Sequence, residues 1–257
     1  MMLRGRGGTV VADCWLLMLW LVSAAAQTVT VPNGEFKMGD NGGDVDERPM
    51  HTVRLSAYRI DAHEVTVASY DSCVAAGACS PAHYTDGKCI LWSRGGPRKV
   101  KVPQRYRSDS FPVVCVSWRQ ARAYCRYKGK KLPTEAQWER AALGGAAGKY
   151  AWGDEQPSES RCTPARRNHP SPVGSYPPNG WGLWDMTGNV WEWVYDRYQP
   201  DYYADAKSEN PAGPTVGRYR VIRGGGWYSG PEQLRVRNRH WFVPEYGEVS
   251  IGFRCAQ

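Results

Sequence analysis

The chain has 257 residues, 42% of them hydrophobic, with 12 tryptophans and a formal net charge of +8. A chain of this length and composition buries a sizeable core, which argues against a disordered protein and predicts one main domain. Its basic residues are dispersed and show no arginine-rich helix or finger motif, so we expect no nucleic-acid partner.

Residues 1–26 have the pattern of a secretion signal. Two arginines near the start precede a short apolar run at Cys14–Val22, and small residues at 23–26 offer a cleavage site. The apolar run is too short to span a bilayer comfortably. We therefore expect an exported protein, periplasmic, cell-surface or secreted, with no stable membrane span after cleavage. An uncleaved membrane anchor is the alternative interpretation.

The first part of the expected domain shows strand patterns and then a helix pattern. Residues 34–39 and 50–61 alternate apolar and polar side chains, as strands do. The stretch 40–49 between them is rich in glycine and acidic residues, which favours a loop. Residues 64–76 have helical spacing, with Thr66 as a possible N-cap.

The middle of the chain has an irregular segment followed by two helix patterns. Residues 80–110 are basic and irregular, and we interpret them as a long surface insertion. Residues 116–127 have an amphipathic pattern with Ser117 as N-cap, and Thr134 with Gln137 fits a capping box before a second helix. Strands mixed with helices in this order predict an α+β fold.

Three blocks of sequence carry a resemblance to a known family. They are the helical block at 117–143, the segment GNVWEW at 188–193 and the segment RGGGW at 223–227. Together they resemble the formylglycine-generating enzymes, or sulfatase-modifying factors, over residues 30–257, which is essentially the whole mature chain. The resemblance implies the fold of that family, which is similar to C-type lectins and has little regular secondary structure.

The same resemblance implies an oxidoreductase site whose key positions differ in this chain. Active members hold copper with two cysteines and place a serine beside it, and these positions are Ser229, Leu234 and Gly226 here. Copper(I) binds through soft thiolates, so we expect no copper and assign no catalytic residue. No histidine stands at a spacing that suggests a triad with Ser229. Whether the chain is an enzyme stays open at this point.

The GNVWEW segment implies a structural calcium site. In the family this segment supplies an asparagine amide, a glutamate carboxylate and backbone carbonyls, and the matching residues here are Asn189, Glu192 and Val190. Oxygen ligands of this kind suit Ca²⁺. The alternative is a turn in which the two polar side chains only satisfy backbone N–H groups.

The cysteines predict disulfides in an exported chain. Removal of Cys14 with the leader leaves seven, so at least one is free or pairs between chains. The resemblance implies a bridge between Cys125 and Cys255, which ties the central helix to the C-terminal strand. The other expected pairs are Cys73 with Cys79 and Cys89 with Cys115. These pairings leave Cys162 as the odd thiol.

The many aromatic residues of the last third serve either core packing or a binding groove, for which Trp193 and Trp227 are the candidates. We expect a domain that binds, or modifies by chemistry without copper, a protein or glycan outside the cytoplasm. One alternative is an oxidoreductase that converts a sulfatase cysteine to formylglycine without the thiols. Another is a structural or partner-binding paralogue, in which the 80–110 insertion closes the groove.

Overall fold

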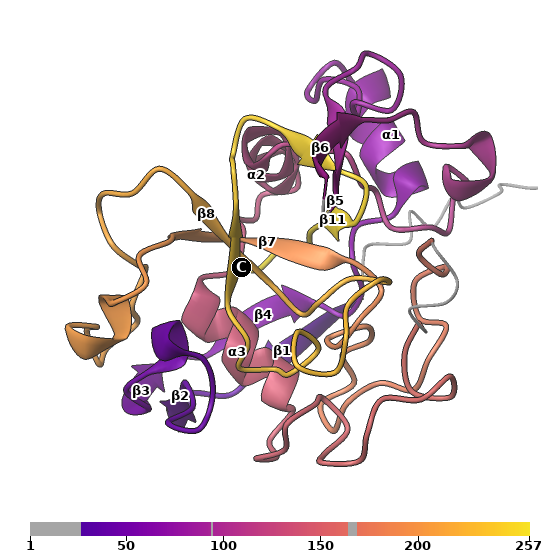
Figure 1. Cartoon of the computed structure of the whole chain (residues 1–257). Coiled ribbons are helices and arrows are strands. Elements are labelled where there is room, and N and C mark those ends of the chain that lie inside the picture. Colours follow the sequence, from indigo (N-terminus) through magenta and orange to yellow (C-terminus); the bar gives the residue numbers. More distant parts are fainter. Residues whose placement is uncertain (1–26, 94, 164–168) are drawn as a thin grey trace, which may run out of the picture.

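The computed structural model describes residues 27–93, 95–163 and 169–257, so the expected leader lies outside the described residues. Short elements are joined by long loops (Figure 1). The helices are α1 (Val67–Ala75), α2 (Trp118–Tyr127) and α3 (Glu135–Leu143), with 3-10 turns η1 (Val45–Glu47), η2 (Gln104–Tyr106) and η4 (Tyr202–Ala204). The strands are β1 (Thr28–Val31), β2 (Gly34–Met38), β3 (His51–Leu55), β4 (Tyr58–Asp61), β5 (Cys89–Ser93), β6 (Gly96–Lys99), β7 (Trp191–Arg197), β8 (Arg220–Arg223), β9 (His240–Phe242), β10 (Gly247–Glu248) and β11 (Ile251–Gly252). The predicted α+β class is confirmed.

The described strands form four small sheets. Strands β2 and β3 pair antiparallel, as do β1 and β4. A sheet in the order β11-β7-β8-β9 contains one parallel pair, β11 with β7, and a sheet in the order β10-β5-β6 contains another, β10 with β5. The segment 50–61, predicted as one strand, is therefore two strands with different partners.

The three predicted helix starts are confirmed by their caps. The Thr66 side chain accepts a hydrogen bond from the Ser69 N–H, 3.2 Å away. Ser117 and Thr134 each form a complete capping box, with Gln120 and Gln137 as the reciprocal partners. These caps satisfy backbone N–H groups that a helix start leaves unpaired.

The 80–110 segment is more regular than the sequence predicts. It contains the β5–β6 hairpin, in which Ile90 lies opposite Lys99, and the η2 turn. The strand β5 also pairs with β10, in which Gly247 lies opposite Cys89, more than 150 residues away in sequence. This pairing joins segments that are far apart in the sequence. The basic, proline-containing segment 80–110 therefore shows little strand pattern by itself.

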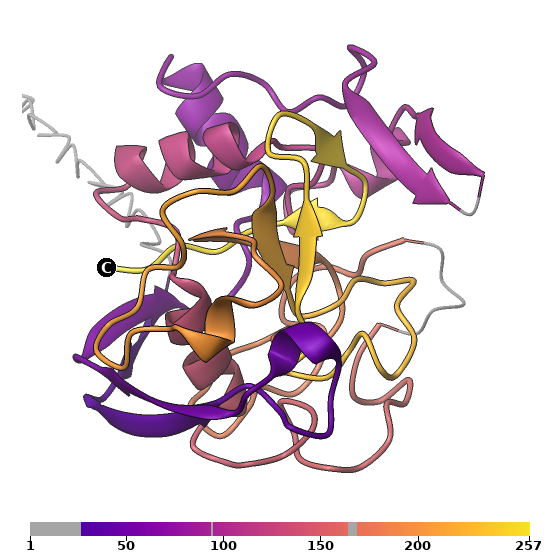
Figure 2. The same ribbon diagram turned by 60° about the vertical axis from the view of Figure 1, so that its left-hand side comes forward.

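The core has two main parts, and both include residues of β7 and β8. Figures 1 and 2 place α1 and α2 on one side of the molecule and β2 and β3 on the other. Helix α3 contacts β2 and β3 on one side and β7 and β8 on the other, with Trp138 fully buried between them. Helices α1 and α2 lie together over the other part, which contains Trp193 and Phe253. The short elements thus rely on large aromatic side chains for burial.

Ion pairs and disulfides complete the interior. Arg254 pairs with Glu192 at 2.7 Å, and both side chains are buried. The expected disulfides are confirmed as Cys73–Cys79, Cys89–Cys115 and Cys125–Cys255. Three bridges suggest an oxidising environment outside the cytoplasm. No helix within the described ranges has the length and apolar character needed to cross a membrane.

Candidate functional site

The RGGGW segment forms the turn that leaves strand β8. Gly224 and Gly225 have positive φ angles of 94° and 76°, which favour glycine. A Cβ atom on Gly225 would lie 2.7 Å from Cδ2 of Leu234, so the two segments approach too closely for a side chain. This contact brings Gly226, Ser229 and Leu234 into one small region.

Ser229 and Leu234 have structural contacts in this region. Ser229 is buried, its Oγ accepts a hydrogen bond from the Gly226 N–H at 3.0 Å, and its own N–H donates to the Gly226 carbonyl at 2.8 Å. Leu234 is buried against Tyr150 and Cys162. A hydroxyl in a tight turn and a leucine in an apolar cluster provide no thiolate for a soft metal.

Cys162 is the unpaired cysteine of the described residues, and it lies beside the Leu234 position. A Cβ atom on Gly188 would lie 3.1 Å from the Cys162 Cβ and 3.7 Å from Cδ2 of Leu234. Burial raises the pKa of the Cys162 thiol to about 11. The thiol is therefore protonated at neutral pH and is a poor nucleophile. The sequence left the place of this cysteine open, and the structure puts it in the core.

The GNVWEW segment places Asn189 and Glu192 among protein partners. Asn189 has a positive φ of 59°, and its Nδ2 donates to Glu64 at 2.6 Å while its Oδ1 accepts from the Ser171 N–H at 2.8 Å. Both Glu192 oxygens accept from Arg254, at 2.7 and 2.8 Å. The amide oxygen of Asn189 is a ligand type that suits a hard cation. The Glu192 carboxylate could bind one only if Arg254 released it. Calcium stays a prediction.

Acidic side chains gather behind this segment. Glu64 is completely buried, and burial raises its pKa well above the ordinary value, with further contributions from the charges of Asp185 and Glu192. Burial likewise raises the pKa of Asp185 to about 6. The carboxyl groups of Glu64, Asp185 and Glu192 therefore all lie near the positive charge of Arg254. Sequence reasoning missed both residues: Glu64 is distant from the motif in the chain, and Asp185 lies just before it, outside the matching segment.

Of the two tryptophans predicted for a groove, Trp227 lines a cavity and Trp193 is buried in the core. Trp193 is fully buried, and its indole N–H donates to the Val116 carbonyl at 3.0 Å, so its expected place in a groove is wrong. The Trp193 ring instead packs in the core near Phe242, with ring centroids 6.0 Å apart. Trp227 is half-buried and lines a cavity of about 280 Å³, away from the larger aromatic cavity described next.

A cavity of about 610 Å³ opens beside the Ser229 turn, and we call it the aromatic pocket. Its aromatic lining comes from β5, β7, β9 and the loops before β8 and after the glycine turn: Trp92, Trp191, Tyr219, Tyr228, Trp241 and Phe242. Tyr228 directly precedes Ser229, and Gln233, which also lines the pocket, directly precedes Leu234. The pocket therefore adjoins the positions where family members hold copper.

The polar groups of the aromatic pocket are Gln233, His240 and Glu248, with Arg218 at its border. Glu248 is buried, and its carboxylate accepts hydrogen bonds from the Ser250 N–H at 2.6 Å and the Trp92 N–H at 3.4 Å. Burial raises the pKa of Glu248 to about 7. The His240 ring lies 5.2 Å from that of Trp191.

The 80–110 insertion lines this pocket instead of filling it. Trp92, on β5, is 56% exposed and faces Phe242 edge-on, with ring centroids 6.4 Å apart. The pocket keeps its volume of about 610 Å³ with this side chain in place. For a structural paralogue, we expected the 80–110 insertion to close the groove. The insertion does not close the aromatic pocket. A weak strand pattern around Trp92 is the sequence signal for β5, the strand that lines this side of the pocket.

The comparisons with known proteins agree with this architecture. Residues 21–257 match the model of the family described as "Sulfatase-modifying factor enzyme 1-like domain". The chain is 39% identical to a formylglycine-generating enzyme of Streptomyces coelicolor, over 89% of this chain and 88% of that protein. It is 31% identical to the inactive C-alpha-formylglycine-generating enzyme 2 of Bos taurus, over 92% of this chain and 91% of that protein.

A solved structure supports the same assignment. PvdO from Pseudomonas aeruginosa superposes with a TM-score of 0.76 and 28% sequence identity, covering 98% of this chain and 99% of that one. The fold expectation is confirmed as the formylglycine-generating-enzyme fold, which is C-type-lectin-like. Because the family model spans nearly the whole chain and the relatives are matched over most of their lengths, this chain belongs to the sulfatase-modifying factor family.

Proposed function

We propose that this domain is an exported binding module whose aromatic pocket holds a glycan. The observation that carries the proposal is the pocket of about 610 Å³, lined by six aromatic side chains and by Arg218, Gln233, His240 and Glu248. A saccharide has apolar C–H faces that stack on aromatic rings and hydroxyls that hydrogen-bond to carboxylate, amide and imidazole groups. Small-molecule sites combine an apolar lining with a few placed polar groups in this way.

The contacts of the polar groups suit a saccharide. Glu248 already accepts protein hydrogen bonds, and its acceptor capacity exceeds them, because a carboxylate has about four lone-pair sites. Because its pKa is about 7, the same group when neutral also donates a hydrogen bond to a ligand hydroxyl. Trp241 is 37% exposed and stacks near Tyr219, with ring centroids 4.1 Å apart, so it offers a rigid face.

The experiment is a screen of the oxidised protein on an array of glycans, followed by calorimetry with the best neutral oligosaccharide. The variant Trp241→Ala is expected to weaken binding about tenfold or more, because a stacked aromatic anchor is a typical hot spot. The variant Tyr127→Ala, which removes an exposed aromatic residue of α2 outside the pocket, is the matched control. Equal affinities for the two variants and the wild type would contradict the proposal.

The second candidate is conversion of a sulfatase cysteine to formylglycine, which is favoured by 39% identity to a formylglycine-generating enzyme. We propose that this activity is absent, because Ser229 and Leu234 supply no thiolate and the nearby Cys162 thiol is protonated. The protein would be incubated with copper, oxygen and a peptide that contains Cys-x-Pro-x-Arg, and mass spectrometry would detect the aldehyde. Conversion at the rate of an active family member would overturn this part of the proposal.

A further inference from the structure

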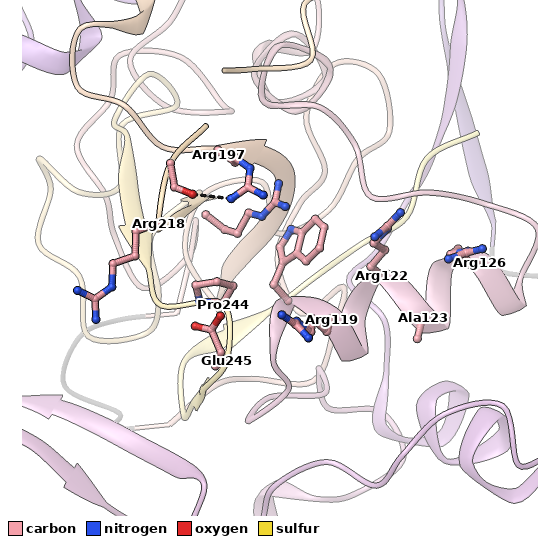
Figure 3. Close-up of a pocket in the computed structure, with 11 residues that line it drawn as sticks. Arg119, Arg122, Ala123, Arg126, Arg197, Arg218, Pro244 and Glu245 are labelled. Carbon is pink, nitrogen blue, oxygen red and sulfur yellow. Dashed lines mark hydrogen bonds between the residues drawn. The ribbon is translucent and has the colours of Figure 1, made fainter. Parts of the chain in front are cut away.

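A second cavity, of about 640 Å³, lies between helix α2, the end of β7, the start of β8 and the turn after β9. We call it the arginine pocket, because its charged lining consists of six arginines and one carboxylate: Arg119, Arg122, Arg126, Arg197, Arg218, Arg220 and Glu245. Figure 3 shows Arg119, Arg122 and Arg126 along α2, with Arg197 across the pocket and Arg218 at its far edge, where its side chain points away from α2. The cluster is not evident in the sequence, because three of its arginines come from other parts of the chain.

These six guanidiniums lack carboxylate partners. Within the described ranges, none of them lies within 4.0 Å of an acidic oxygen. Elsewhere four buried arginines pair with acids: Arg223 with Glu139, Arg235 with Glu47, Arg239 with Glu135 and Arg254 with Glu192. Arginines therefore outnumber carboxylates around this cavity, where Glu245 is the acidic residue of the lining and Asp196 lies near Arg220.

Two of the arginines are held in place by the backbone. The Nη1 of Arg220 donates to the Tyr195 carbonyl at 2.6 Å, and its guanidinium lies 3.7 Å from the ring centroid of Trp118. The Nη1 of Arg197 donates to the Gly217 carbonyl at 2.5 Å. Each contact uses only part of the guanidinium, which has five N–H donors. The remaining donors are fixed in direction before any ligand arrives, which lowers the entropy that binding costs.

The charges around Arg220 would favour a bound anion. Burial, together with the neighbouring charge of Arg197, lowers the pKa of Arg220 to about 10. A bound oxyanion would offset both effects, since an opposite charge favours the ionised form. Arginine forks match the oxygens of sulfate and phosphate in pairs, which gives short and strong hydrogen bonds.

The arginine pocket and the aromatic pocket share a wall. Arg218 lines both cavities, and Tyr219, the next residue, lines the aromatic one. Arg218 also lies over the Tyr219 ring, with its guanidinium carbon 5.6 Å from the ring centroid. One ligand can therefore place a ring in the aromatic pocket and a charged substituent among the arginines.

We infer that the arginine pocket binds a sulfate or phosphate ester carried by the saccharide that the aromatic pocket holds. This inference rests on the proposed function for the saccharide, while the anion site itself stands on the unpaired arginines. The three disulfides suggest an oxidising environment, in which glycans are more accessible partners than nucleic acids. A nucleic acid is therefore treated as an outcome of the test.

The test is calorimetry on the full oxidised chain with two matched pairs of probes. They are a sulfated heparin tetrasaccharide with its desulfated form, and mannotriose 6-phosphate with mannotriose. The expected result is that at least one ester-bearing probe binds at least tenfold more tightly than its neutral partner, and that added salt weakens this gain. The pair that shows the larger gain identifies the ester.

The variant Arg122→Ala/Arg126→Ala is expected to remove that gain. Both side chains are exposed on α2 and make no hydrogen bond to the described protein, so the double variant is expected to fold normally, as circular dichroism checks. Arg98→Ala is the matched control, because Arg98 is an exposed arginine of β6 outside the pocket. A gain that survives the double variant, no gain from either ester, or tighter binding of a single-stranded DNA octamer than of both ester probes would overturn the inference.

Failure of the inference can be distinguished from failure of the proposed function. If Trp241→Ala weakens binding of the neutral probes but the esters add no affinity, the glycan site stands and the anion site is wrong. If the double arginine variant weakens binding of inorganic sulfate and of the esters while Trp241→Ala changes nothing, the anion site stands and the saccharide assignment is wrong.

Discussion

Arg254 and Glu192 form a fully buried ion pair whose surroundings leave each group few unused hydrogen-bond positions. Arg254 donates to both Glu192 oxygens and to the carbonyls of Asp61, Ala62 and Trp184. Such a pair adds little net stability relative to an apolar pair, because both charges have lost their hydration. Removal of one partner alone is costly, because the other charge then stays buried without a partner.

The variant Glu192→Ala is therefore expected to lower the free energy of unfolding by about 3–5 kcal/mol. Its surface control is Glu35→Ala, which breaks the exposed Arg54–Glu35 pair and is expected to cost about 1 kcal/mol or less. Urea unfolding at pH 7 measures both. Similar midpoints for the two variants would show that Arg254 finds water or another acid when Glu192 is absent.

Calcium at Asn189 is tested by chelation. The family resemblance predicts that excess EDTA lowers the melting temperature at fixed pH, because an ion that binds only the folded state stabilises it. Asn189→Asp is expected to keep the response and Asn189→Ala to remove it. An unchanged melting temperature on chelation would show that the contacts of Asn189 with Glu64 and Ser171, and of Glu192 with Arg254, hold this segment without an ion.

At the scale of elements, the Cys125–Cys255 bridge connects α2 to the segment after β11 across 130 residues of sequence. The Cys73–Cys79 bridge spans only 6 residues beside α1. On the chain-entropy model a long closed loop restricts the unfolded chain more than a short one does. The two bridges therefore differ in expected stabilisation although both are buried.

Replacement of Cys125 and Cys255 together by alanine is expected to lower the free energy of unfolding by about 5 kcal/mol, against about 2 kcal/mol for the Cys73 and Cys79 pair. Denaturant unfolding of the two double variants, with matching m-values, makes the comparison. Peptide mapping without reductant checks the bridges first. Equal losses would show that packing at the two sites, and not loop length, sets the effect.

The elements that the sequence predicted are those whose signals are local. Thr66, Ser117 and Thr134 were identifiable as caps because each bonds an N–H only three residues ahead. The split of 50–61 into β3 and β4 was not, because the partner of β4 is β1. Pairings of this kind depend on the whole chain, which a short window of sequence does not contain.

The candidate site was predicted in part. Gly226, Ser229 and Leu234 were located because they follow a contiguous motif, and they do lie together. Trp92 and Trp241 were not assigned to a groove, because they reach the aromatic pocket from β5 and β9, and only tertiary structure brings these strands together.

At the scale of the whole molecule, buried carboxyl groups make stability depend on pH. Burial raises the pKa of Glu248 to about 7, whereas the ordinary value in an unfolded chain is about 4.3. The folded state therefore binds this proton more tightly. The resulting stabilisation is fully present below about pH 4 and is lost as the pH rises through about 7.

The difference in unfolding free energy between wild type and Glu248→Gln isolates this contribution from those of other acids. Relative to the variant, the wild type is expected to lose about 3 kcal/mol between pH 4 and pH 8, in order of magnitude. Urea titrations at intervals of one pH unit measure the difference. Parallel curves for the two proteins would show that Glu248 is ionised throughout and that its hydrogen bonds from Ser250 and Trp92 compensate for burial.

The Cys89–Cys115 bridge links the structure of the aromatic pocket to the oxidation state of these two thiols. Cys89 begins the strand that contains Trp92, and the Cys115 N–H donates to the main-chain carbonyl of Glu248 at 3.1 Å. Before the thiols are oxidised, only non-covalent contacts hold these two walls together. We therefore expect the two walls to be held together less firmly in a reduced chain than in an oxidised one.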